Sequence, residues 1–296
     1  MDLAQPLRDF KPSKNFFIGI DSDGCVFDSM EVKQKECFCP MFIKHFHLQA
    51  ASKYARQTWE FVNLYSKTRG CNRFLALSAS LKFLRSRAEV MARGVTIFDT
   101  APLDEWLEHE NKLSNDSLAA AVQSGRAVLA PVLAWSKAVN AAIADIVRGV
   151  PPFPPVRPCL DLMLAQADTM VISQTPGEAL RREWVEHNID SCVRLIAGQE
   201  MGSKTEHLKF AAAGKYPPEK ILMIGDAPGD FKAAKSNHVL FYPIVPGREE
   251  QSWQRLREEG LRRFFAGKFA GDYEKQLCEE FEASLPAIPP WQAPQI

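Results

Sequence analysis

Residues 16–24 read FFIGIDSDG, and this stretch decides the fold. Residues 16–20 are apolar apart from one glycine, which predicts a short buried strand. Two aspartates, Asp21 and Asp23, follow where that strand ends. Because a single strand is not stable alone, we expect residues 16–20 to pair with strands elsewhere in the chain.

The second half of the chain alternates between short apolar runs and helical patterns. The predicted strands are 169–172, 193–197, 220–224 and 239–245. Helices are predicted between them, at 203–213, at 230–236 and from Pro176, which suits the first turn of a helix. This alternation is typical of a parallel sheet with helices on both faces. The sequence therefore predicts an α/β fold with a Rossmann-like, doubly wound parallel sheet.

The segment between the first strand and the others is predicted to be an inserted, all-helical domain. Residues 29–150 carry Ala, Leu, Lys and Glu at helical spacing and contain no convincing strand. Five prolines in 149–158 cannot continue a helix, so we interpret this stretch as the return hinge. The predicted boundaries are 1–28 with 152–296 for the α/β domain, including a helical extension at 249–285, and 29–151 for the helical domain.

The composition indicates a globular chain without bulk nucleic-acid or membrane partners. Lys and Arg together number 36, as do Asp and Glu, whereas nucleic-acid binders usually carry a positive surplus. The N-terminus lacks an apolar signal region, and we find no apolar run that approaches a membrane span. Seven scattered cysteines indicate free thiols in a reducing cytoplasm. We therefore expect a cytoplasmic protein, and its oligomeric state stays open.

Polar side chains follow three of the predicted strands. In open α/β sheets, ligands bind at the carboxyl ends of the strands, so these side chains are candidates for a shared site. Lys204 opens the helix between the second and third of these strand ends, and one further aspartate follows four residues after the third. The residues in chain order are Asp21, Asp23, Ser173, Lys204, Asp226 and Asp230.

This ordered set resembles the haloacid dehalogenase superfamily of phosphohydrolases. The four motifs are DxDG in FFIGIDSDG, the serine in MVISQT, the lysine in GSKTEHL and GDxxxD in ILMIGDAPGD. Each motif alone is weak, but four in order on the right predicted elements are specific. The helical insertion between the first and second motifs is similar to the first class of cap domain in this family.

The resemblance implies a role for each motif residue. Asp21 would attack phosphorus and form an aspartyl-phosphate, and Asp23 would protonate the leaving alcohol and later deprotonate water. Ser173 and Lys204 would bind the phosphoryl oxygens. A Mg2+ ion, which prefers oxygen ligands, would be held by the carboxylates of Asp21, Asp226 and Asp230 and by the backbone carbonyl of Asp23.

The resemblance therefore implies a Mg2+-dependent phosphomonoesterase that acts on a small phosphorylated metabolite. Family members that cleave C–halogen or C–P bonds typically lack an acid at the position of Asp23, which favours a phosphatase or phosphomutase. Two alternatives stay open. One is a sugar phosphomutase resembling beta-phosphoglucomutase, and the other is a protein that binds phosphometabolites or partners without turnover.

Residues outside the four motifs are weaker candidates. Arg69 and Arg73 lie in TRGCNR, which resembles the basic specificity loop of sugar-phosphate mutases and would clamp a second anionic group. A solvated helix–helix turn is the other interpretation of that loop. Gln174 and Thr175 follow Ser173 and face either the substrate or the core, with Gln174 a candidate phosphate ligand. Asp28 and Ser29 lie at the exit toward the cap and are expected to shape the turn there rather than to touch the substrate.

Overall fold

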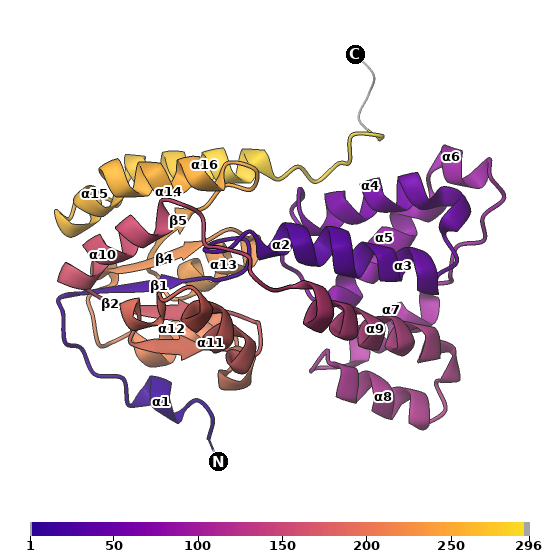
Figure 1. The fold of residues 1–296 in the computed structure, drawn as a ribbon, viewed down its shortest axis with the longest axis horizontal. Coiled ribbons are helices and arrows are strands. Elements are labelled where there is room, and N and C mark those ends of the chain that lie inside the picture. Colours follow the sequence, from indigo (N-terminus) through magenta and orange to yellow (C-terminus); the bar gives the residue numbers. More distant parts are fainter. Residues whose placement is uncertain (1, 293–296) are drawn as a thin grey trace. The chain divides into compact units, whose positions relative to one another are not determined.

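The computed structural model describes residues 2–292 and contains a five-stranded, all-parallel sheet (Figure 1). The strands are β1 (Phe16–Ile20), β2 (Ala167–Ile172), β3 (Leu195–Ala197), β4 (Ile221–Gly225) and β5 (Leu240–Pro243). Their order across the sheet is β3-β2-β1-β4-β5. The first strand therefore lies at the centre, which confirms that residues 16–20 pair with strands from the second half of the chain.

The register of the sheet brings the polar strand ends together. Ile20 pairs with Val171 on one side and with Ile224 on the other. Ser173 lies two residues after Val171, and Asp226 lies two residues after Ile224. The backbone N–H of Asp21 donates to the carbonyl of Ile224 at 3.0 Å, so the chain is still fixed to the sheet at this aspartate.

Helices cover both faces of the sheet because successive strand side chains point to opposite sides. Ile18 and Ile20 are buried in one hydrophobic cluster, whereas Phe17 is buried in another. The helices of this part are α1 (Gln5–Arg8), α10 (Val156–Gln166), α11 (Gly177–Glu186), α12 (Lys204–Ala211), α13 (Pro228–Ser236), α14 (Glu249–Arg255), α15 (Leu261–Phe265) and α16 (Asp272–Ser284). The predicted α/β class is confirmed.

The chain divides into two compact units. The first contains residues 2–29 and 149–285, and the second contains residues 30–148 together with the described end of the chain, 286–292. Residues 30–148 form no strand. The remaining helices are α2 (Ser29–Val32), α3 (Cys39–His45), α4 (Ser52–Asn63), α5 (Arg73–Arg85), α6 (Ala88–Met91), α7 (Ala101–His109), α8 (Asn115–Gln123) and α9 (Ala130–Ile146). The second unit has its own aromatic core, built around Trp59 and Trp135.

Two sequence-based boundaries need correction. Residues 286–292 belong with the helical unit, although the sequence grouped them with the α/β domain. Trp291 packs edge-to-face on Phe61 and Phe83, contacts that a Pro-rich tail does not reveal. The return hinge is also shorter than expected, because α10 already begins at Val156.

The sequence led us to expect no apolar run that approaches a membrane span, but the stretch 127–146 is such a run. Within residues 2–292 it is one helical stretch that is long and apolar enough to do so, judged by length and composition alone. Core helices of soluble proteins meet the same criteria. Its buried side chains include Val132, Trp135 and Val139, which lie in the core of the helical unit.

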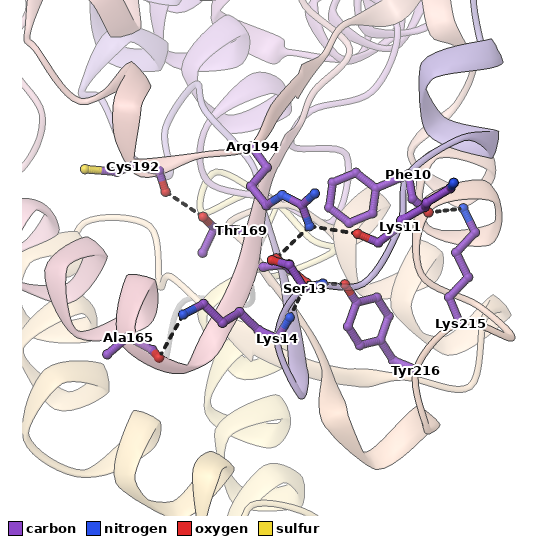
Figure 2. Close-up of polar contacts among 11 residues, drawn as sticks. Phe10, Lys11, Ser13, Lys14, Ala165, Thr169, Cys192, Arg194, Lys215 and Tyr216 are labelled. Atoms are coloured by element: carbon purple, nitrogen blue, oxygen red, sulfur yellow. Dashed lines mark hydrogen bonds and ion pairs between the residues drawn. The ribbon is translucent and has the colours of Figure 1, made fainter.

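The N-terminal segment is fixed to the sheet by one buried carboxylate, that of Asp168 in β2. Figure 2 shows Ser13, Arg194 and Tyr216, which come together around this carboxylate. It accepts hydrogen bonds from the backbone N–H and hydroxyl of Ser13, from the backbone of Lys14, from Tyr216 and from Arg194. Burial alone would raise the pKa of Asp168, but these donors hold it well below the usual range. The carboxylate therefore stays ionised and ties residues before β1 to strands that follow the insertion.

Candidate active site

Three buried aspartates form an acidic cluster at the carboxyl ends of the central strands. Asp21 follows β1, Asp226 follows β4, and Asp230 lies in the first turn of α13. One carboxylate oxygen from each of the three lies within 4.8 Å of the others. All three residues are at most 5% exposed. The structure thus brings together three of the four residues predicted to ligate a metal ion.

Local sequence explains how Asp230 reaches this cluster. Pro228 and Asp230 occupy the first turn of α13, and the Asp230 carboxylate accepts from the backbone N–H of Ala227 at 3.1 Å. A Cβ atom on Gly225 would lie 2.3 Å from Cγ of Asp230. Only glycine at position 225 leaves room for this carboxylate, which gives the GD pair of the fourth motif a steric reason.

Lys204 connects two members of the acidic cluster. Its Nζ lies 2.7 Å from an Asp21 oxygen and 2.6 Å from an Asp230 oxygen, and its side chain is only 15% exposed. Ser203 and Glu206 form a capping box that starts α12 at Lys204, so the lysine is fixed at the first helical position. Burial opposes the charged form, yet the two carboxylates raise the pKa of Lys204 above its usual value.

The charges of this group call for a further cation. Three carboxylates and one lysine sum to a formal charge of −2 in a buried site. Burial raises the pKa of Asp21 to about 6 even though Lys204 opposes the shift, and Asp230 adds to it. A divalent ion with oxygen ligands would balance the charge, and the carboxylates of Asp21, Asp226 and Asp230 fit such an ion.

Asp23 has different surroundings from Asp21. One of its carboxylate oxygens accepts from the Thr175 hydroxyl at 2.6 Å, and the other accepts from the Ser29 hydroxyl. Gly24 follows with φ +74°, a left-handed conformation that turns the chain four residues after the end of β1. The two aspartates of the first motif are therefore held by different partners, one by a lysine and the other by hydroxyl groups.

The loop after β2 places Ser173 at the same edge of the sheet. Ser173 is buried, its backbone N–H donates to Ala197, and its hydroxyl accepts from the N–H of Thr175 at 3.2 Å. The Gln174 side chain is exposed and donates to the backbone carbonyls of Ser173 and Gly202. Gln174 thus connects two loops of the site, and its predicted contact with phosphate stays a prediction.

The two arginines predicted to bind an anion have partners within the helical unit. Arg69 is 3% exposed and donates to the carbonyl of Leu64. Arg73 donates to Ser136 and to Asn140, at 2.7 Å for the latter. These bonds fix the helices of the unit, and the anion-binding role of Arg69 and Arg73 stays a prediction.

Sequence reasoning did not find the contact between Thr175 and Asp23. The two residues are far apart in the chain, and only the pairing of β1 with β2 brings them together. It predicted a turn-shaping role for Ser29, whose hydroxyl also contacts Asp23. One signal was available in the sequence: Thr175 comes three residues after β2, just as Asp23 comes three residues after the neighbouring strand β1.

Comparison with known proteins finds similarity in structure but not in sequence. No family model matches the chain, and no curated protein matches it. A haloacid dehalogenase-like family hydrolase from Streptococcus pneumoniae has a TM-score of 0.43 at 13% identity, with 81% of this chain and 90% of that chain covered. A predicted phosphoglycolate phosphatase from Haemophilus somnus has a TM-score of 0.44 at 14% identity, with coverages of 78% and 86%.

A third solved structure is described as a candidate beta-phosphoglucomutase from Bacteroides vulgatus. Its TM-score is 0.45 at 13% identity, with 88% of this chain and 90% of that chain covered. The solved structures that resemble this chain include one described as haloacid dehalogenase-like, the family that the four motifs resemble. Because the TM-scores are below 0.5, these likenesses carry no argument; the fold is read from the sheet itself, and the function proposed next rests on the residues of this chain.

Proposed function

We propose that this chain is a Mg2+-dependent phosphomonoesterase that hydrolyses a small phosphorylated metabolite through an aspartyl-phosphate. One observation carries the proposal. Asp21 lies in a buried acidic cluster, and Lys204 contacts one of its carboxylate oxygens. Asp23, two residues later, instead accepts hydrogen bonds from two hydroxyl groups. A nucleophile and a proton donor need such unequal surroundings, because one must stay ionised while the other gains and loses a proton.

In the first step, a carboxylate oxygen of Asp21 attacks phosphorus and the bond to the leaving oxygen breaks. Asp23 gives its proton to that oxygen, so the product leaves as an alcohol. In the second step, Asp23 takes a proton from water as the water oxygen attacks phosphorus, and the bond to Asp21 breaks. Inorganic phosphate leaves, and both aspartates return to their starting states.

The other residues of the site hold charge and orient the phosphoryl group. Lys204 offsets the carboxylate charge that would repel a phosphate and offers its ammonium to a phosphoryl oxygen. The Ser173 hydroxyl would donate to a second oxygen. Asp226 and Asp230, with Asp21, would hold the Mg2+ ion, which when bound neutralises phosphoryl charge. The helical unit would act as the cap that selects the leaving group, and a cytoplasmic location stays a prediction.

The test is phosphate release from a panel of phosphorylated metabolites, measured with Mg2+ and with EDTA. Asp21→Asn should abolish release, and Asp190→Asn, which changes an exposed aspartate of the same unit, should not. Release that survives in Asp21→Asn would reject the proposed nucleophile. No release from any ester, with isomerisation of a sugar phosphate instead, would favour the phosphomutase, and binding without either reaction would favour the non-catalytic binder.

A further inference from the structure

Both oxygens of the Asp23 carboxylate are held by hydroxyl groups. Thr175, after β2, donates to Oδ2 at 2.6 Å, and Ser29, at the start of α2, donates to Oδ1. The three residues belong to the same compact unit. An aspartate side chain rotates about two bonds, and one donor on each oxygen restricts both rotations.

Thr175 is itself fixed by its neighbours. Its backbone N–H donates to the Ser173 hydroxyl, and its carbonyl accepts from the N–H of Gln199 at 3.1 Å. Threonine is β-branched, so few χ1 rotamers are open to it. These backbone contacts and the restricted χ1 angle hold the Thr175 hydroxyl in an orientation toward Asp23, and a positioning residue needs such a fixed orientation.

The hydroxyl group suits a residue that alternates between acid and base. It donates to the carboxylate form of Asp23, and it accepts when that oxygen is protonated, so the contact survives both states. A backbone N–H or a lysine can only donate, so such a partner would favour the carboxylate form. A carboxyl group that is held in one orientation presents its proton to the leaving oxygen in each turnover.

We propose that Thr175 is a positioning residue for the acid–base chemistry of Asp23, with Ser29 holding the other carboxylate oxygen. This inference rests on the proposed function. Thr175 does not contact the acidic cluster in any hydrogen bond that the structure shows for it, so its effect would pass through Asp23. Its removal should therefore weaken proton transfer more than substrate binding.

The leaving group provides the readout. Alkyl phosphates release a poor leaving group that needs a proton, whereas 4-nitrophenyl phosphate releases a good one that does not. In Thr175→Val, we expect kcat/KM for alkyl phosphates to fall about 10- to 100-fold, a part of the effect of a general acid. We expect a much smaller fall for 4-nitrophenyl phosphate, little change in KM, and recovery in Thr175→Ser.

Two further variants keep the test decisive. Ser29→Ala removes the other hydroxyl and should give the same dependence on the leaving group, even if Thr175→Val folds poorly. Ser191→Ala changes an exposed serine of the same unit and should match the intact protein with every ester.

The possible failures are distinguishable. Suppose that the intact protein hydrolyses the esters. Equal losses for all esters in Thr175→Val, or no recovery in Thr175→Ser, would then overturn the inference and leave the proposed function standing. If Thr175→Val and Ser29→Ala both hydrolyse the esters as well as the intact protein does, the inference is likewise overturned and the proposed function stands. No hydrolysis of any ester by the intact protein would overturn both.

Discussion

Replacing Lys204 with methionine tests the charge balance of the acidic cluster. Methionine has a similar length but carries neither charge nor a hydrogen-bond donor, so Asp21 and Asp230 both lose a partner at less than 3 Å. Removing one partner of a buried ion pair typically costs about 3–5 kcal/mol, because the remaining charge stays desolvated. We expect the free energy of unfolding to fall by about that amount at pH 8 in EDTA.

Protonation should recover part of this loss. The folded-state pKa of Asp21 is raised to about 6, above the roughly 3.9 of an unfolded aspartate. Its contribution to stability is therefore present below about pH 4 and is lost as the pH rises through about 6. Without Lys204 the folded-state pKa should rise further, so the variant should regain stability between pH 8 and pH 5 more steeply than the intact protein.

Mg2+ should recover another part. An ion that binds only the folded state stabilises it by about 2.7 kcal/mol at a concentration 100 times its Kd. The three carboxylates stay in place in Lys204→Met, and without the lysine they present more negative charge to the ion. The stabilisation by Mg2+ should therefore be larger in the variant than in the intact protein.

The assay should report on the sheet alone, since the chain has two compact units. Urea unfolding followed by hydrogen exchange of peptides from β1 and β4 does this. Lys209→Met is the matched control, because Lys209 is an exposed lysine of the same helix. If Lys204→Met proves as stable as Lys209→Met in EDTA, or if neither acid nor Mg2+ reduces its deficit, the reasoning from buried charge is wrong.

Three other predictions concern structure that supports the site. Asp168→Asn should lower the free energy of unfolding at pH 7 by about 3 kcal/mol, because charge-assisted hydrogen bonds are lost. In acid unfolding below about pH 4, the variant should lose less stability than the intact protein, because the ionised carboxylate is already absent. Gly225→Ala should displace Asp230, destabilise by about 1–3 kcal/mol and weaken Mg2+ binding in calorimetry; unchanged binding would contradict the steric argument. Trp291→Ala should destabilise the helical unit by about 1–2 kcal/mol, measured by hydrogen exchange of α4 and α5, because it removes ring contacts and the indole stacked 4.3 Å from Arg87.

Sequence reasoning succeeded where one local pattern determines one local structure. The apolar run at 16–20 forms β1 with the predicted bounds, and the parallel sheet follows from the alternation of strands and helices. The acidic cluster follows as well, because parallel strands end at the same edge. Strand ends were less exact: β3 begins at Leu195 and β5 ends at Pro243. Pro243 is tolerated there because β5 is an edge strand whose outer side needs no N–H donor.

Contacts between distant side chains were out of reach. The donors to Asp168 come from residues 13, 14, 194 and 216, and no spacing in the sequence links these positions. The packing of Trp291 on Phe61 depends equally on tertiary structure. The partners of Asp168 and of Trp291 are determined by the tertiary fold. A search for local sequence motifs therefore cannot find these contacts.

The two aspartates of DSDG have different surroundings, although they are only two residues apart in the sequence. Asp21 is still fixed to β4 by its backbone and faces carboxylates and a lysine, so its ionisation depends on the charges at the strand ends. Asp23 lies beyond the sheet, where Gly24 turns the chain, and its carboxylate accepts from two neutral hydroxyls. In the mechanism proposed above, the spacing DxD would therefore present an ionised nucleophile and a reversible proton donor to the same phosphoryl group.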